Sequence, residues 1–240
     1  MSSRRTGAVL GCLFVLVATA GCLGVLTEPE SLSFSAKETL VGADSLERTG
    51  YAPAGNRTLE NELVVRTDGQ ERDVSIVSRV NVYDRSVDRS ELDVNASALS
   101  GNASAGTGEA AQFAVLATPV ASVRGTSVNP LASMSIEELV RRFVAASRES
   151  GGTDTRNGTR EPDLTLVENR TVESLDAERT VSTYRSSADG SDASGDSALV
   201  HVARFEHDGD RIVVVAGHPA LLDERDRVDA LLAGLERVEG

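Results

Sequence analysis

Residues 198–217, ALVHVARFEHDGDRIVVVAG, decide the fold. Two apolar segments, Ala198–Glu206 and Arg211–Gly217, flank the tetrapeptide 207–210, His-Asp-Gly-Asp. An Asp-Gly pair between apolar segments is typical of a tight hairpin turn, so the stretch predicts two antiparallel strands. Ile212–Ala216 is apolar at every position and leaves no polar face. This pattern predicts a central strand that is covered on both faces.

Two segments with helical periodicity are available to cover that strand. Residues 135–148 begin with Ser135 and Glu138 in the spacing of a capping box. Their apolar positions lie on one helical face: Ile136, Leu139, Val140, Phe143 and Val144. A last helix is predicted after Asp223, with an apolar stripe of Val228, Leu231, Leu232, Leu235 and Val238. We expect one helix on each face of the central strand.

Further strands are predicted wherever apolar residues alternate with polar ones. They are residues 32–36, 46–51, 59–65, 74–82, 112–118, 164–167, 172–175 and 179–184. Three polar stretches without periodicity, residues 85–108, 149–163 and 186–197, are predicted to be flexible loops. Together the elements predict an α+β fold, in which an antiparallel β-sheet carries helices packed on its faces, within one domain over residues 31–240.

The order helix, strand, strand, hairpin, C-terminal helix over residues 130–240 resembles the PsbP-like scaffold, an α/β/α sandwich. PsbP-like proteins are mostly non-catalytic accessory subunits that bind membrane complexes or small partners. The resemblance therefore implies a binding role and no enzymatic activity.

The start of the chain has the layout of an export signal. Arg4 and Arg5 precede an apolar run of about a dozen residues, which is shorter than the roughly 20 needed to span a bilayer. The run ends in Thr-Ala-Gly-Cys at positions 19–22, which resembles the lipobox of bacterial and archaeal lipoproteins. That resemblance implies a signal peptide over residues 1–21, a lipid on Cys22 and a tether over residues 22–30. Secretion without a lipid, or retention of the run as a membrane anchor, is the alternative.

The export route stays open at this point. The Ser-Arg-Arg at positions 3–5 also resembles a twin-arginine signal, and the general export route is the alternative. Either route predicts an extracytoplasmic protein, anchored to the outer face of the cell membrane through Cys22.

The cysteines and asparagines also fit an exported protein. Cys12 lies inside the apolar run, so a processed chain keeps Cys22 alone and forms no intrachain disulfide. The pattern Asn-x-Ser/Thr occurs at five of the eight asparagines. These candidate glycosylation sites are Asn56, Asn95, Asn102, Asn157 and Asn169. Chance matches in a chain rich in Ser and Thr are the alternative at each position.

The composition indicates a protein made for high salt. The formal net charge is −13, and it becomes −15 once Arg4 and Arg5 leave with residues 1–21. Lys37 is the only lysine. Such acidic, lysine-poor chains resemble uncharacterised secreted lipoproteins of haloarchaea. Molar salt screens the self-repulsion of such a surface. The lack of a basic patch in the sequence argues against nucleic acid as a partner.

No pattern in the sequence indicates a catalytic site, so no catalytic residue and no cofactor are assigned. Two histidines of this hairpin, His201 and His218, are candidate metal ligands, but their spacing fits no standard site, so no metal site is assigned. We interpret His201 as a residue of the less buried strand face and His218 as a residue at a strand exit.

The leading hypothesis is a non-catalytic, lipid-anchored domain with a binding or accessory role, whose partner is the membrane and an unknown protein or small ligand. The alternatives are a surface hydrolase or metal-dependent enzyme, and a structural envelope component.

Overall fold

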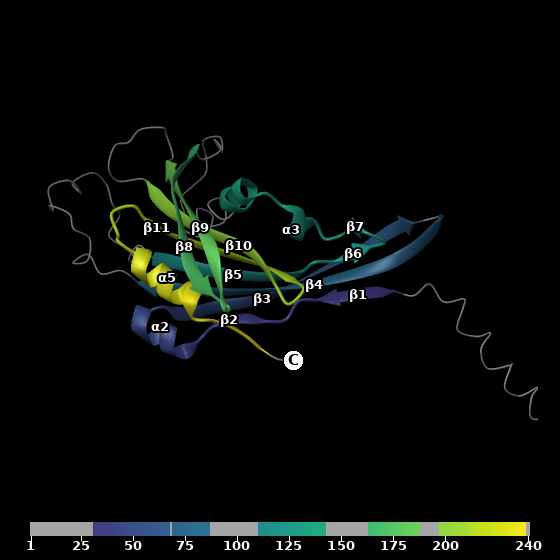
Figure 1. Cartoon of the computed structure of the whole chain (residues 1–240), viewed down its shortest axis with the longest axis horizontal. Helices are drawn as coiled ribbons and strands as arrows, with labels where there is room; N and C mark the ends of the chain where they lie inside the picture. The colour runs from purple at the N-terminus through teal and green to yellow at the C-terminus, as the bar shows by residue number, and fades with distance from the viewer. Residues whose placement is uncertain (1–30, 68, 87–109, 143–162, 188–196, 239–240) are drawn as a thin grey trace, which may run out of the picture. The chain divides into compact units, whose positions relative to one another are not determined.

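A computed structural model describes residues 31–67, 69–86, 110–142, 163–187 and 197–238 (Figure 1). The strands are β1 (Leu32–Ser35), β2 (Thr39–Val41), β3 (Ala52–Thr67), β4 (Gln70–Ser86), β5 (Ala110–Pro119), β6 (Ser122–Val123), β7 (Thr126–Ser127), β8 (Asp163–Ser174), β9 (Ala177–Ser187), β10 (Ala198–His207), β11 (Asp210–Pro219) and β12 (Leu235–Arg237). The helices are α2 (Ala43–Thr49), α3 (Pro130–Ser133) and α5 (Arg225–Ala233), and a further helix covers residues 136–142.

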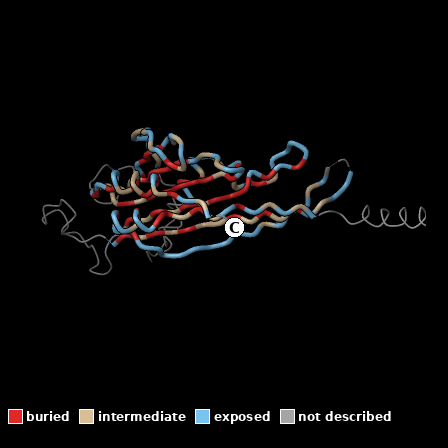
Figure 2. Tube along the Cα trace, turned by 60° about the horizontal axis from the view of Figure 1, so that its bottom comes forward, coloured by how far each residue is buried: buried red, intermediate tan, exposed pale blue. Residues whose placement is uncertain are grey.

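One sheet dominates the described part of the chain. Its eight strands follow the order β1-β4-β5-β11-β10-β9-β8, and β3 also pairs with β4. The pairings from β4 through β5, β11, β10 and β9 to β8 are all antiparallel. Strand β11 is central, and Ile212–Ala216 is buried along its whole length, which confirms the predicted central strand. Buried segments run along the strands of the sheet in Figure 2.

Two apolar clusters lie on the two faces of β11. One joins Ile212 and Val214 to the α5 residues Val228, Leu231 and Leu232. The other joins Val213 and Val215 to Leu139 and Val140 of the helix 136–142. Ser135 Oγ accepts a hydrogen bond of 3.2 Å from the Glu138 amide, so Ser135 caps that helix as predicted.

The predicted fold class is wrong. The chain is mostly β-sheet with few, short helices, and it is not the α/β/α sandwich that the PsbP-like resemblance implied. The physical reason is strand length: β3 and β4 have 16 and 17 residues, whereas α2 and α5 have only 7 and 9. Each described helix is therefore too short to cover a whole face of the sheet, and the helices do not form the two outer layers of a sandwich.

Three local predictions also fail. Residues 46–51 were expected as a strand, but 43–49 form α2, which ends at Gly50 with φ +74°. The two strands expected at residues 164–167 and 172–175 are one strand, β8, which ends at Ser174 and has an irregularity between Leu166 and Glu168. The last helix ends at Gly234, and β12 pairs with β2 instead of continuing the helix.

The chain divides into two compact units. One holds Met1–Leu32 and Glu62–Val74, whose described part includes the β3–β4 turn with Gly69 at φ +77°. The other holds Ser33–Asn61 and Ser75–Gly240, and it contains the two apolar clusters and the site described below. Within the described residues, every helix is too short or too polar to cross a membrane. Most of the three predicted loops lies outside the described residues.

Candidate functional site

Two buried histidines face each other at the centre of the sheet. His201 lies on β10 and His218 on β11, and the register of this hairpin pairs His201 with Ala216 and Leu199 with His218. The two histidines therefore sit diagonally on the same face. Their Nε2 atoms are 2.9 Å apart, and the two rings lie end to end and nearly parallel, with centroids 5.1 Å apart and an interplanar angle of 17°. Only 3% of His201 and 4% of His218 is exposed, so the interpretation of His201 as a residue of a less buried face is wrong.

The hydrogen-bond partners of the two histidines determine which ring nitrogens carry a proton. His218 Nδ1 lies 2.9 Å from the Pro219 carbonyl oxygen, which can only accept, so His218 carries its proton on Nδ1. Its Nε2 then accepts from His201 Nε2–H. His201 Nδ1 in turn accepts from the Thr183 hydroxyl at 2.9 Å. All four ring nitrogens are thus used in one directional chain of hydrogen bonds.

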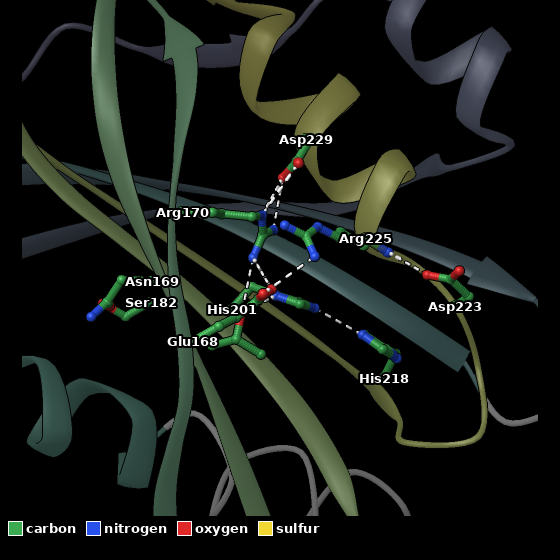
Figure 3. Close-up of polar contacts among 10 residues, drawn as sticks. Glu168, Asn169, Arg170, Ser182, His201, His218, Asp223, Arg225 and Asp229 are labelled. Carbon is green, nitrogen blue, oxygen red and sulfur yellow. Dashed lines mark hydrogen bonds and ion pairs between the residues drawn. The ribbon is translucent and has the colours of Figure 1, made fainter.

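Arg170 of β8 begins this chain (Figure 3). One terminal nitrogen donates to Thr183 Oγ1 at 2.8 Å and lies 3.2 Å from His201 Nδ1. The other terminal nitrogen and Nε of Arg170 donate hydrogen bonds of 2.7 and 2.9 Å to the Asp229 carboxylate of α5. Arg170 also reaches Glu168 at 3.5 Å. The arginine therefore ties helix α5 to the sheet and leaves His201 facing a cation.

Both histidines are held neutral. Burial, followed by the neighbouring His218 and the charge of Arg170, lowers the pKa of His201 from 6.5 to about 3. Burial also lowers the pKa of His218, against the hydrogen bond to Pro219 and the charge of Glu224. Neutral rings agree with the proton pattern above, because a protonated His201 would place a donor against Thr183 and Arg170.

A pocket of about 260 Å³ opens beside the pair. It is lined by Val167, Glu168, Thr183, Leu199, His201, His218, Leu222, Asp223, Glu224 and Arg225. These residues come from β8, β9, β10, β11 and the segment that leads into α5. The pocket therefore lies where the start of α5 meets the edge of the sheet.

Glu224 forms the deepest carboxylate of the pocket. Its side chain is fully buried and binds Arg85 of β4. Tyr51 donates to its second oxygen at 3.1 Å, and Arg227 approaches at 3.1 Å. Burial and the Glu224 charge raise the pKa of Tyr51, which stays protonated and donates. The residue immediately before α5 is Glu224, and not Asp223 as predicted. No side-chain hydrogen bond caps the helix at Glu224.

The sequence singled out His201 and His218 but none of the groups that hold them. The hairpin register alone predicts that the two histidines share a face. Arg170 and Asp229 are 59 residues apart and carry no shared motif, so no sequence pattern predicted their pairing. His207 lies at the end of β10 beside Asp208 and is not part of this pocket.

Metal ligation receives no support from this geometry. Nitrogens that bind one zinc ion each lie about 2.0 to 2.1 Å from the metal. Here the two Nε2 atoms are hydrogen-bonded to each other, so a metal ion has no room between them. In the described part of the chain, no three His, Cys, Asp or Glu side chains gather to hold a metal ion.

Two of the five candidate glycosylation sites lie on described strands. Asn56 is exposed on β3, and Asn169 is exposed on β8, where its Oδ1 accepts from Ser182 at 2.7 Å. Asn95, Asn102 and Asn157 lie outside the described residues, as does the lipidation candidate Cys22. Lipidation and glycosylation stay predictions.

Comparison with known proteins supplies a family without a function. A search of curated proteins finds no match. Residues 38–236 match the model of a domain of unknown function, DUF6517. This match spans most of the 240 residues and includes the whole pocket, so the chain belongs to the DUF6517 family.

Proposed function

We propose that this chain is a non-catalytic binding domain, held at the outer face of a haloarchaeal cell membrane by a lipid on Cys22, and that the pocket beside His201 and His218 takes a small ligand. The observation that carries the binding role is the complete use of the four imidazole nitrogens inside the protein. A general base must present a lone pair to its substrate. Neither ring has one to present.

Two of the three carboxylates of the pocket, Glu168 and Glu224, are engaged in a similar way. Glu224 accepts from three side chains, and Glu168 contacts Arg225 at 3.2 Å and Arg170 at 3.5 Å. A substrate that approaches either carboxylate therefore has to compete with these protein donors. The pocket therefore has the properties of a preorganised binding surface more than those of an acid–base site.

A surface hydrolase is the second candidate, because the pocket does bring two histidines close to three carboxylates, Glu168, Asp223 and Glu224. This activity requires the bond between His201 and His218 to open, so that His218 Nε2 faces the substrate. A His218→Gln variant separates the two functions: an enzyme loses its turnover, whereas a binding domain has no turnover to lose.

The proposed function is tested on the full chain, extracted with mild detergent from the membrane of cells that make it. Leu199→Trp places a large side chain in the pocket, and Val64→Trp is the matched control on an exposed position outside it. We expect mass spectrometry after denaturation to recover the same small molecule from wild type and Val64→Trp, and at least about tenfold less from Leu199→Trp. Equal recovery from all three, or turnover of a test substrate that His218→Gln abolishes, would contradict the proposal.

The lipid anchor is tested separately. Cys22→Ser removes the thiol that the lipobox resemblance assigns to the lipid, so the variant is expected in the supernatant after the membranes are sedimented. A single acyl chain gives only marginal membrane binding, so the wild type is expected to carry a lipid with two chains. A variant that sediments with membranes as fully as the wild type would show that another element anchors the chain.

A further inference from the structure

The rim of the pocket carries charges with spare bonding capacity. Asp223 is exposed, and within the described residues its Oδ1 accepts a long hydrogen bond of 3.4 Å from the Arg225 amide. Arg225 is half exposed and uses one terminal nitrogen to contact Glu168. A guanidinium has five N–H donors, so further donors of Arg225 remain for a ligand. In Figure 3 the Asp223 carboxylate lies beside the backbone amide of Arg225, and the Arg225 guanidinium points the other way, toward Glu168. The rim therefore offers a carboxylate and a guanidinium from residues two positions apart.

The walls below this rim are apolar. Val167, Leu199 and Leu222 line the pocket, and Val167 is half exposed at the β8 irregularity. The rings of His201 and His218 add to this wall, because their nitrogens are already bonded to protein atoms. A ligand that enters the pocket thus meets an aliphatic and aromatic lining under a charged rim.

The charge pattern selects the kind of head group. Buried Glu224 is compensated by Arg85 and Arg227, and Arg170 by Asp229. At the rim, Arg225 pairs with Glu168, whereas Asp223 forms no ion pair within the described residues. Opposite charges lie 3.2 Å apart where Arg225 meets Glu168. A ligand with adjacent ammonium and carboxylate groups complements this pattern.

We propose that the pocket binds a small α-amino acid with an aliphatic side chain, a refinement that rests on the proposed binding function. The ammonium donates to the Asp223 carboxylate, and the ligand carboxylate accepts from N–H groups of Arg225 that Glu168 does not use. The side chain packs on Leu199 and Val167. A pocket of about 260 Å³ is below the range of drug-sized sites and matches a ligand of this size.

Two related ligand classes fit less well. Quaternary ammonium groups are recognised in aromatic cages, and the pocket is lined by no Phe, Tyr or Trp. Amino acids with the two charges at opposite ends of a long chain hold their ammonium and carboxylate too far apart to reach Asp223 and Arg225, which are two residues apart, at the same time.

The test uses isothermal titration calorimetry on the full chain in detergent and molar salt. The probe is L-leucine, and each comparison compound tests one feature: 4-methylpentanoate lacks the ammonium, 3-methylbutylamine lacks the carboxylate, N,N,N-trimethyl-L-leucine lacks N–H donors, and 6-aminohexanoate separates the charges. We expect leucine to bind at least about tenfold more tightly than each of them, because charge-assisted hydrogen bonds are lost in every case.

Two variants assign the contacts. Asp223→Asn is expected to weaken leucine binding about tenfold, whereas Asp226→Asn, an exposed acid of the same helix that does not line the pocket, is expected to leave it unchanged. Arg225→Gln is expected to remove the preference for leucine over 3-methylbutylamine. Circular dichroism of each variant confirms that it is folded.

Three outcomes would overturn the inference. They are no saturable heat with leucine, equal affinity for leucine and the amine with the wild-type chain, and equal weakening by Asp223→Asn and Asp226→Asn. If leucine fails but the natural chain still yields a small molecule that Leu199→Trp loses, the amino-acid assignment is wrong and the binding function stands.

Discussion

At the scale of single residues, the buried histidine pair makes stability depend on pH. The folded-state pKa of His201 is about 3 and that of His218 is also lowered, whereas an unfolded histidine titrates near 6.5. Below pH 6.5 the unfolded chain therefore binds more protons than the folded chain. Stability is complete above pH 6.5 and falls as the pH decreases.

We expect the free energy of unfolding to fall by about 2 kcal/mol for His201 alone between pH 7.5 and pH 5, with a further loss from His218. Urea unfolding at constant salt measures it. The double variant His201→Gln, His218→Gln is expected to flatten this dependence, although it is less stable at pH 7.5. His207→Gln, at a partly exposed turn position, is the control and is expected to keep the full dependence. A double variant with the pH dependence of the wild type would refute this source of it.

A second residue, Glu224, holds three elements together. Its carboxylate binds Arg85 of β4 and Arg227 of α5, and it accepts from Tyr51. Glu224→Gln removes the charge that compensates buried Arg85, so the variant is expected to lose about 3 to 5 kcal/mol of unfolding free energy. Glu71→Gln breaks the exposed pair with Arg66, and its expected loss is within about 1 kcal/mol. Similar losses in chemical denaturation would show that the Glu224 network contributes little.

At the scale of elements, helices α2 and α5 lie side by side and meet at a glycine (Figure 1). A Cβ on Gly234, which ends α5, would lie 2.5 Å from the Cβ of Ser45 in α2. Gly234→Ala is therefore expected to cost about 1 to 3 kcal/mol through forced separation of the helices. Thermal unfolding measures the loss.

The matched variants isolate the contact. Adding Ser45→Gly to Gly234→Ala removes the clashing side chain and is expected to recover part of the loss, a coupling that a double-mutant cycle measures. A Cβ on Gly55 meets nothing within 4 Å, so Gly55→Ala is expected to show no packing penalty. Additive effects of the Ser45 and Gly234 changes would contradict the clash.

The same elements show what a sequence can predict. The β10–β11 hairpin was predictable because an Asp-Gly turn and a fully apolar strand are local patterns. Strand β12 was not, because Leu235–Arg237 pairs with Thr39–Val41 almost 200 residues earlier, and its apolar spacing continues that of α5. Helix α2, with only 7 residues, is too short to show a helical period.

The site, like the fold, was predictable from the sequence only where local patterns determine it. The two histidines share a face because the hairpin turn sets their register, which is local information. Their burial, their proton pattern and the pocket depend on Arg170 of β8 and on the approach of α5, which only long-range packing determines. The share of the sheet covered by helices was overestimated, because an apolar stripe predicts that one helical face is buried but not how much of the sheet this face covers.

At the scale of the whole molecule, the net charge of −13 predicts that folding depends on salt. Acids outnumber basic residues 37 to 24, so compaction brings like charges together. Molar salt reduces the screening length to about 3 Å, whereas about 0.1 M salt extends it to about 10 Å. We therefore expect the domain to be folded in molar KCl and to unfold as KCl falls to about 0.1 M.

Circular dichroism during dialysis from molar KCl measures this transition. A variant with Glu47→Gln, Glu60→Gln and Glu178→Gln removes three exposed negative charges without touching the pocket, so its transition is expected at a lower KCl concentration. Sucrose at low salt is the control, because it favours burial by exclusion from the surface but screens no charge. A chain equally stable at both salt concentrations, or one that sucrose stabilises as well as KCl, would show that charge screening does not hold this acidic fold together.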